Sequence, residues 1–242
     1  MKMYYDLHLH SALSPCGDND MTPNNLVNMA YLKQLDMIAL TDHNCAKNLP
    51  AAKKIADETG ILFIPGMEIE TSEEIHILAY FETLEGALLF GDELEKKYLP
   101  KIKNRVDIFG NQYVMDENDC VVTELENLLT VATTLSFQDA AEIVTGFGGV
   151  CVHAHVDKSA YSVFSNLGYI PPECRFTTLE ISKKPTARQF AEEKQLYSNY
   201  QIIQSSDAHY LKDISERENF IEICGKSTKS FLNFVKNFSI FF

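Results

Sequence analysis

Residues 4–11 read Tyr-Tyr-Asp-Leu-His-Leu-His-Ser, and this stretch carries the first signal of both fold and chemistry. The apolar and aromatic run Met3–Leu9 has the length and composition of a buried β-strand. Successive side chains alternate across a strand, so His8 and His10 point to the same side where this strand ends. The stretch therefore predicts a strand that places two imidazoles at one edge of a sheet.

Six further strand-like runs follow along the chain, and helical patterns separate most of them. The runs are Met37–Thr41, Ile61–Pro65, Ile75–Tyr80, Gly149–Val152, Thr178–Ile181 and Gln201–Gln204. Alternating strands and helices predict an α/β fold with a largely parallel sheet, either open or closed into a barrel. Only about ten residues separate the third strand from the fourth, too few for a crossover helix. We therefore expect these two strands to be antiparallel, a distortion of an otherwise regular barrel.

Residues 83–135 interrupt the alternation of strands and helices. They contain a charged helical segment, Asp92–Lys97, and a hairpin-like stretch with its turn at residues 116–119. A second helical segment, Glu124–Ala132, follows. We expect residues 1–242 to form one domain in which residues 83–135 are an inserted helix and hairpin segment, or lid.

The composition is that of a soluble globular protein, with 45% hydrophobic and 23% charged residues. No apolar run approaches the roughly 18 residues that a membrane-spanning helix needs, so no membrane association is expected. The chain opens into a strand-like run without the pattern of a signal peptide. The six cysteines are scattered without a C-x-x-C motif, which favours reduced thiols and a cytoplasmic location.

The charge balance is strongly acidic. The 21 Lys and Arg against 34 Asp and Glu give a net charge of −13. Such a chain repels polyanions, so we expect no stable binding of a nucleic-acid polymer. A small phosphorylated substrate remains open, especially where bound cations reverse the local charge. The oligomeric state does not follow from the composition.

The seven histidines follow or begin the predicted strands. A lone histidine is more often a hydrogen-bonded core or surface residue than a ligand. Here all seven are expected at the one rim where parallel α/β barrels keep their active sites, beside two carboxylates. Imidazole and carboxylate together suit zinc, iron or manganese. The residues concerned are His8, His10, His43, Glu68, His76, His153, His155, Asp207 and His209.

The ordered motifs resemble those of the PHP family, the polymerase and histidinol phosphatase domains. They are Asp6-Leu7-His8-Leu9-His10-Ser11, Thr41-Asp42-His43, Gly66-Met67-Glu68, His76, the His155 segment and Ser206-Asp207-Ala208-His209. The resemblance runs from residue 4 to about residue 210. It implies a distorted seven-stranded barrel that holds two or three divalent metals and hydrolyses phosphoesters. Amidohydrolase-type enzymes also begin with H-x-H, but they continue with a lysine after the fourth strand and a final lone aspartate.

Carried over by this resemblance, the ligands form three sets. His8, His10, Glu68 and Asp207 would hold one metal. Glu68 would bridge to a second metal that is also held by His76 and His155. A third metal would use His43, His209 and Asp18, with Cys16 as the alternative to Asp18.

Further residues would support these ligands. Asp6 and Asp42 would orient ligand imidazoles through their free N–H groups, or else cap the backbone where strands end. His153 would be a supporting partner of the ligands or a fortuitous extra imidazole. Lys158 would anchor the substrate phosphate, or else be a solvated surface lysine. Arg217 and Lys183 are weaker candidates for that anchoring role.

These assignments predict a metal-dependent phosphoesterase or phosphatase in which a metal-activated hydroxide attacks a small phosphoester. Glu68, Asp207 and Lys158 would carry the catalysis, with zinc, manganese or iron as the metal. The substrate would be a phosphorylated metabolite or a mononucleotide. The alternatives are a 3'-5' exonuclease acting on single-stranded nucleic acid and a non-catalytic, metal-bound module that serves a partner.

Overall fold

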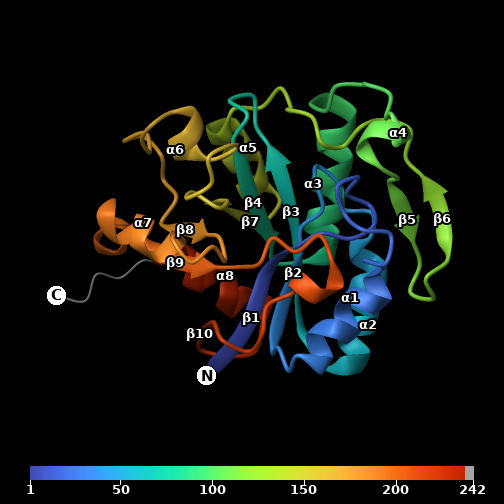
Figure 1. The fold of residues 1–242 in the computed structure, drawn as a ribbon, viewed down its shortest axis with the longest axis horizontal. Helices are drawn as coiled ribbons and strands as arrows, with labels where there is room; N and C mark the ends of the chain where they lie inside the picture. The colour runs from blue at the N-terminus through green and yellow to red at the C-terminus, as the bar shows by residue number, and fades with distance from the viewer. Residues whose placement is uncertain (238–242) are drawn as a thin grey trace.

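The computed structural model describes residues 1–237 (Figure 1). All seven predicted strands form, and together with one further strand they make a curled sheet of eight strands. The strand order is β10-β1-β2-β3-β4-β7-β8-β9. Their bounds are β1 Lys2–Leu9, β2 Met37–Leu40, β3 Leu62–Glu70, β4 His76–Phe81, β7 Gly149–His153, β8 Thr178–Ile181, β9 Gln201–Gln204 and β10 Phe220–Glu222. The curled sheet is consistent with a distorted barrel of PHP type.

The pairing of β3 with β4 confirms the predicted distortion. The two strands are antiparallel, and Glu70 of β3 lies opposite His76 of β4. β1, β2 and β3 are parallel, as are β7, β8 and β9. The short eighth strand, β10, was not expected. It pairs antiparallel with β1, so this sheet has eight strands and not the expected seven.

Eight α-helices lie in the described part of the chain. They are α1 Pro23–Leu32, α2 Leu49–Thr59, α3 Leu84–Lys97, α4 Val106–Phe109, α5 Phe137–Gly146, α6 Val163–Asn166, α7 Ala187–Glu193 and α8 Thr228–Lys236, with short 3₁₀ turns at Leu196–Ser198 and Leu211–Asp213. Local sequence accounts for several ends. Thr22 accepts the Asn25 N–H at the start of α1, and Gly60 adopts a φ of 77° where α2 stops. None of the helices within residues 1–237 is long and apolar enough to cross a bilayer.

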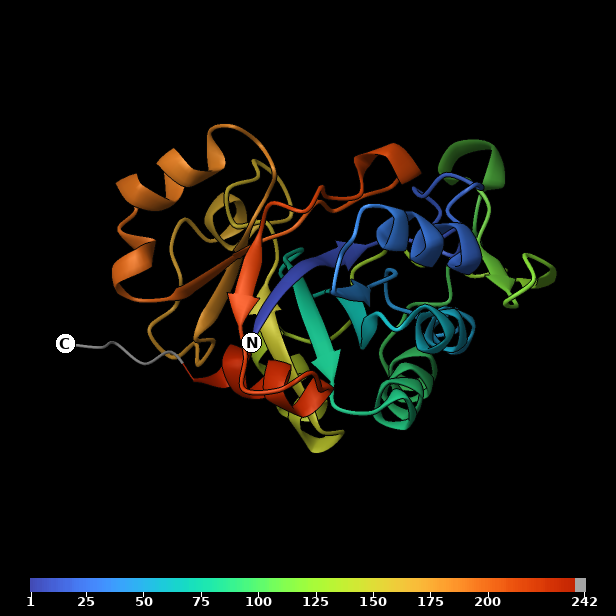
Figure 2. The same cartoon turned by 90° about the horizontal axis from the view of Figure 1, so that it is seen from below.

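Two apolar cores flank the sheet. The larger core lies between its outer face and α1, α2, α3 and α5, with Phe90 and Val144 among its fully buried residues. The second core lies on the inner face, where Phe231 of α8 packs with Leu7 and Tyr80. Figure 2 shows α8 lying across the lower side of the sheet, close to the N-terminus. β1 and β3 run towards the upper side, where they carry the buried polar residues His8 and Glu68.

The segment 83–135 packs beside this upper edge. It holds α3, α4 and a two-stranded hairpin, β5 Tyr113–Met115 and β6 Val121–Glu124, which Figure 1 shows next to α1 and α2. The Tyr113 N–H donates to the Ala12 carbonyl, which ties the hairpin to the loop after β1. The helix expected at residues 124–132 does not form, because long-range bonds hold that backbone extended; the Leu128 N–H donates to Ile102. One domain with this segment as an insertion stays a prediction.

Candidate metal centre

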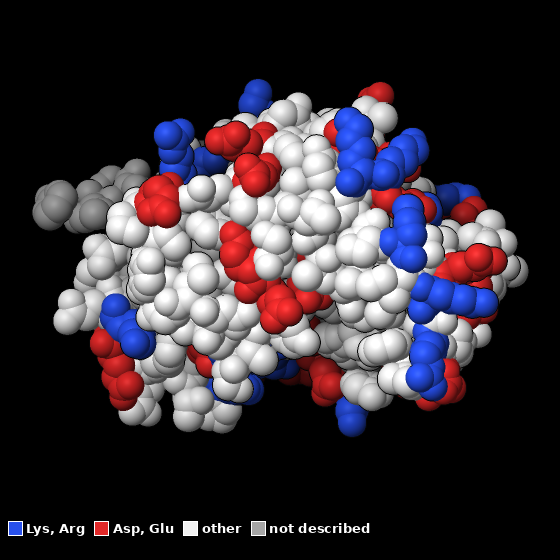
Figure 3. Space-filling model, turned by 90° about the horizontal axis from the view of Figure 1, so that it is seen from above, with Lys and Arg blue, Asp and Glu red and all other residues white. Residues whose placement is uncertain are grey.

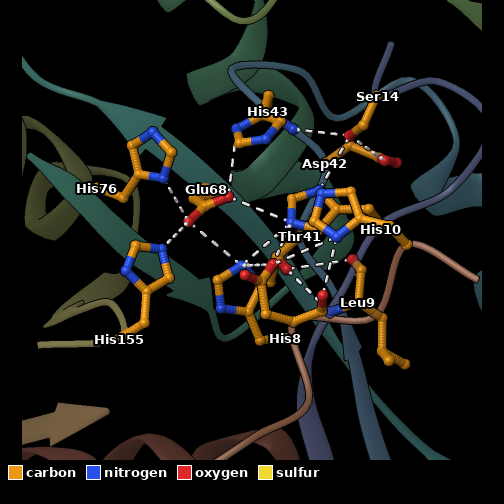
Figure 4. A network of polar contacts seen from close by, with 12 residues as sticks. His8, Leu9, His10, Ser14, Thr41, Asp42, His43, Glu68, His76 and His155 are labelled. Carbon is orange, nitrogen blue, oxygen red and sulfur yellow. Dashed lines mark hydrogen bonds and ion pairs between the residues drawn. The ribbon is translucent and has the colours of Figure 1, made fainter. Parts of the chain in front are cut away.

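Glu68 of β3 lies at the centre of the histidine cluster (Figure 4). The fully buried carboxylate lies within 3.3 Å of an imidazole nitrogen from each of five histidines, His8, His10, His43, His76 and His155. Glu68 lies inside β3 rather than after it, because β3 continues to Glu70 opposite β4. The antiparallel turn-back therefore places His76 beside Glu68, with Nδ1 2.9 Å from Oε1.

Asp207 adds a second carboxylate to the cluster. Its Oδ1 lies 3.1 Å from Nε2 of His10 and 3.3 Å from Nε2 of His8. The segment after β9 reaches this place because Ala208 forms a bridge with Leu9 at the end of β1. Asp207 adopts a positive φ of 53°, an uncommon conformation for a residue other than glycine. Such strained backbone is often found at functional sites.

Three groups of side chains within residues 1–237 lie close enough to hold a metal ion. They are His8, His10, Glu68 and Asp207; His43, Glu68 and His76; and His10, His43 and His209. The first group is the predicted first ligand set. The second group contains His43 where His155 was expected, although His155 Nε2 still lies 3.1 Å from Glu68. The third group contains His10 where Asp18 was expected.

The donor atoms fit a shared cation better than they fit one another. Oε2 of Glu68 lies 3.2 Å from nitrogens of both His10 and His43, yet Oε2 and His43 Nδ1 are without a hydrogen-bond partner. His8 Nε2 and His10 Nε2 lie 3.1 Å apart. Converging imidazole nitrogens and carboxylate oxygens, some of them without a hydrogen-bond partner, are the donor set that zinc, iron or manganese takes. The described residues thus contain clusters that can bind divalent metal.

The electrostatics of the protein alone show how strongly these groups interact. Burial opposes the charged form of Glu68, but the imidazoles of His76, His8 and His43 hold its pKa well below the usual range. Burial likewise opposes the charged form of His10, yet the hydrogen bond to Asp207 and the adjacent Glu68 carboxylate raise its pKa to about 9. Burial lowers the pKa of His43 well below its usual value. The cluster is therefore a tightly coupled charge system with Glu68 as its anion.

Glu180 of β8 is a site residue that the sequence interpretation missed. Its buried carboxylate accepts a hydrogen bond from His8 Nδ1 at 2.9 Å and another from the His155 N–H at 2.9 Å. These bonds leave His8 Nε2 facing Glu68 and Asp207. The available signal was a lone charged residue in the short apolar run Thr178–Ile181. That signal becomes informative only once β8 is known to lie within reach of β1.

The two aspartates predicted to support the ligands do so indirectly. Asp42 accepts hydrogen bonds from the hydroxyls of Ser11 and Ser14, and the Ser14 hydroxyl contacts His10 Nδ1 at 3.0 Å. Asp6 contacts no imidazole. Its two oxygens accept the N–H groups of Ser206 and Ser215, so it fixes both ends of the loop that carries Asp207. Asp6 therefore takes the backbone-capping alternative.

Asp18 and Cys16 lie in the loop after β1, outside the three groups. The half-buried Asp18 donates its N–H to the His209 carbonyl, and its carboxylate accepts the Asp20 N–H at 2.9 Å. Cys16 is exposed. Asp18 is thus adjacent to the third group through its backbone, and its ligand role stays a prediction.

His153 departs from the expectation that every histidine reaches one rim. β7 ends at His153, and His155 has a φ of 29°, so the two rings do not share one face as residues two apart along a strand would. The His153 ring packs between Phe137 and Phe176, with its Nε2 3.5 Å from the Cys174 sulfur. Burial lowers its pKa to about 3. His153 therefore contacts the core beside α5 and not the ligand cluster.

Of the three cations considered for the substrate phosphate, Lys158 alone contacts the cluster. Its ammonium group forms an ion pair with Asp207, and its side chain is 30% exposed. Burial opposes its charge, but Asp207 raises the pKa of Lys158 above the usual value. Arg217 instead pairs with Asp36 and lies over the Tyr4 ring, and Lys183 donates to the Asp213 carbonyl.

Comparison with known protein families matches residues 6–223 to the PHP domain. The chain therefore belongs to the PHP domain family, as its motifs predicted. It is 40% identical over 81 residues to a 5'-3' exoribonuclease of Haemophilus influenzae; the match covers 32% of this chain and 28% of that protein. It is 36% identical over 76 residues to a 3',5'-nucleoside bisphosphate phosphatase of Chromobacterium violaceum; this match covers 30% of this chain and 26% of the phosphatase. The matched segments thus span about a quarter of these relatives.

Solved structures share the fold at low sequence identity. The lesion-specific endonuclease PfuEndoQ of Pyrococcus furiosus superposes with a TM-score of 0.71 at 18% identity, over 98% of this chain and 56% of the endonuclease. The relatives are named as a phosphatase, an exoribonuclease and an endonuclease, all of them hydrolases of phosphoesters. The expectation of a hydrolase is confirmed at the level of the family.

The expectation about partners is wrong. Small phosphorylated substrates without nucleic-acid polymers were inferred from the net charge of −13, yet an exoribonuclease and a DNA-lesion endonuclease are among the similar proteins. Net charge is a sum over the whole surface, whereas binding depends on the local distribution. Figure 3 shows the face seen from above, with acidic side chains near its middle and many Lys and Arg gathered towards the side of α3 and α4. A polyanion therefore does not meet a uniformly negative surface.

Proposed function

We propose that this chain hydrolyses a phosphoester bond of a nucleotide, either free or as a residue of a nucleic-acid chain. The observation that carries the proposal is the convergence of five imidazoles and the Asp207 carboxylate around Glu68. The nucleotide part is supported by the relatives, whose names share nucleotide phosphoesters as substrates. Two or three divalent cations, zinc, manganese or iron, would occupy the centre.

The proposed ligand sets share residues around Glu68. His8, His10, Glu68 and Asp207 would hold one cation, and Glu68 would bridge to a second near His76 and His155. His43 and His209 would serve a third. Bound cations would supply Lewis-acid stabilisation of phosphoryl charge and a water nucleophile of lowered pKa.

Two residues of the chain would position a metal ligand and supply positive charge to the substrate. Glu180 fixes the His8 ring so that Nε2 faces the centre. Lys158 holds its ammonium at the outer oxygen of Asp207, where it would bind a substrate phosphate oxygen. Because phosphoryl transfer depends mostly on positioning and charge neutralisation, a fixed cluster with an ammonium group at its partly exposed rim suits that reaction.

The test compares Glu68→Gln with Glu142→Gln, a change of an exposed carboxylate on α5. Metal content is measured after purification without chelator. Hydrolysis is measured on a mononucleotide, a nucleoside 3',5'-bisphosphate and an end-labelled oligoribonucleotide. We expect Glu68→Gln to lose bound metal and nearly all turnover, with Glu142→Gln unchanged. Wild-type protein that holds metal yet hydrolyses none of the three would contradict the proposal and favour a non-catalytic, metal-bound module.

A further inference from the structure

The segment 155–162, between β7 and α6, directs three side chains at the metal centre at intervals of three residues. His155 contacts Glu68 at 3.1 Å, and Lys158 pairs with Asp207. The third side chain, Tyr161, stacks on His76. The first two have roles in the proposed hydrolysis. Tyr161 has none so far, although it touches the same cluster.

The Tyr161 ring lies between the buried histidine cluster and the solvent. Its centroid lies 4.8 Å from that of His76, with 20° between the ring planes. The residue is nevertheless 48% exposed, while His76 is buried. One face of the ring thus rests on the imidazole, and much of the rest is open beside the centre. Aromatic rings exposed in this way are the surfaces on which nucleic-acid bases stack.

The backbone at Tyr161 adopts a strained conformation. Its φ of 55° lies in the left-handed region, which a bulky residue rarely adopts and glycine adopts freely. Hydrogen bonds hold the strained conformation in place: the His76 N–H donates to the Tyr161 carbonyl at 3.0 Å, and the Ser162 hydroxyl donates to the Lys158 carbonyl at 2.8 Å. Strain combined with an exposed aromatic ring at an active-site rim points to a binding role.

We propose that Tyr161 is the platform on which the base of the substrate stacks while the phosphate of the same nucleotide lies at the metal centre. This inference rests on the proposed function, since it assumes a nucleotide substrate. Lys158 and Tyr161 then divide the recognition: the ammonium contacts the phosphate, and the phenol ring contacts the base. A free nucleotide and the end residue of a chain both present these two groups.

The first experiment removes the ring and keeps the backbone. Tyr161→Gly suits a φ of 55°, so the segment retains its path without the aromatic face. We expect KM for a mononucleotide to rise about tenfold or more, in line with measured base–aromatic stacking. KM for glycerol phosphate, which has no base, should stay within about twofold. Tyr161→Phe should behave as wild type, as should Tyr169→Ala, which removes an exposed tyrosine beyond α6.

An equal rise of KM for both substrates would overturn the inference, because it would mean that Tyr161 only clamps His76. An unchanged KM for the mononucleotide in Tyr161→Gly would overturn it too. Failure of wild-type protein to hydrolyse either substrate would instead count against the proposed function. In that case binding is still measurable by fluorescence.

The fluorescence experiment uses the absence of tryptophan from the chain. Tyr161→Trp introduces a single indole at the proposed platform, and Tyr169→Trp introduces one at the control position. With metal-loaded protein, we expect a mononucleotide to quench the emission of Tyr161→Trp, and ribose 5-phosphate at the same concentration to leave it unchanged. Tyr169→Trp should respond to neither. Equal responses to both ligands at position 161 would contradict stacking of the base.

Discussion

The carboxylate of Glu180 and the imidazole of His8 form a fully buried pair between two strands that are far apart in the sequence. Nδ1 of His8 lies 2.9 Å from one Glu180 oxygen and 3.2 Å from the other. Because a carboxylate only accepts, Nδ1 carries the proton, and Nε2, which faces Glu68 and Asp207, would be the atom available to a bound metal. The same carboxylate also accepts the His155 N–H. One residue of β8 thus orients two members of the cluster.

We predict that Glu180→Gln weakens metal binding without unfolding the protein. The neutral amide stabilises the required tautomer of His8 less than the carboxylate does, and partners of this kind typically contribute about 10–100-fold to metal affinity. Titration of metal-free protein with Zn²⁺ or Mn²⁺, beside Glu142→Gln, measures the effect. An affinity equal to that of wild type would show that Glu180 serves only the backbone of His155.

A separate prediction concerns the proposed ligands of the third metal. His209→Ala should remove about one metal equivalent and leave the two-metal arrangement that supports in-line displacement. If Asp18 is a ligand, Asp18→Ala should do the same. Metal-to-protein ratios measured on purified variants decide the point. A wild-type ratio in Asp18→Ala together with a reduced ratio in His209→Ala would leave His10, His43 and His209 as the protein donors.

Lys158→Ala should raise KM more than it lowers kcat. An ammonium group that binds a phosphate oxygen equally in the ground and transition states contributes uniform binding, which appears in KM. Initial rates over a range of mononucleotide concentrations give both constants, and the exposed Lys229→Ala serves as the control. A large fall in kcat with unchanged KM would show instead that Lys158 acts on the transition state or holds Asp207 in place.

The inner core predicts a stability effect that is independent of catalysis. Phe231 of α8 is fully buried and packs edge-on against Tyr80 at a centroid distance of 5.2 Å. Phe231→Ala should therefore lower the free energy of unfolding by about 3–5 kcal/mol, the usual cost of a large cavity. Urea denaturation measures the change, with Lys229→Ala on the same helix as the reference. A loss below about 1 kcal/mol would mean that α8 contributes little to the inner core.

Local patterns in the sequence carry much of the fold. Each of the seven strand-like runs forms a strand, and the short link after β3 correctly indicated an antiparallel β4. Thr22 at the start of α1 and Gly60 at the end of α2 are also residue types that suit those positions. These features depend on side-chain alternation, chain length and backbone preference, which neighbouring residues determine. The failed helix at residues 124–132 shows the limit, since contacts with Ile102 and Asn44 hold that segment instead.

The sequence by itself determined which residue types gather at the end of each strand, and hence the motifs from His8 to His209. Only the tertiary structure decided which of them meet. In the structure, Glu180 contacts His8, and Tyr161 stacks on His76. His153 packs in the core, and Asp18 lies outside the three groups that could hold a metal ion. The physical reason is that strand alternation fixes direction only within a strand. Beyond the strand end, positive φ angles at His155, Tyr161 and Asp207 set the direction, and long-range hydrogen bonds hold them.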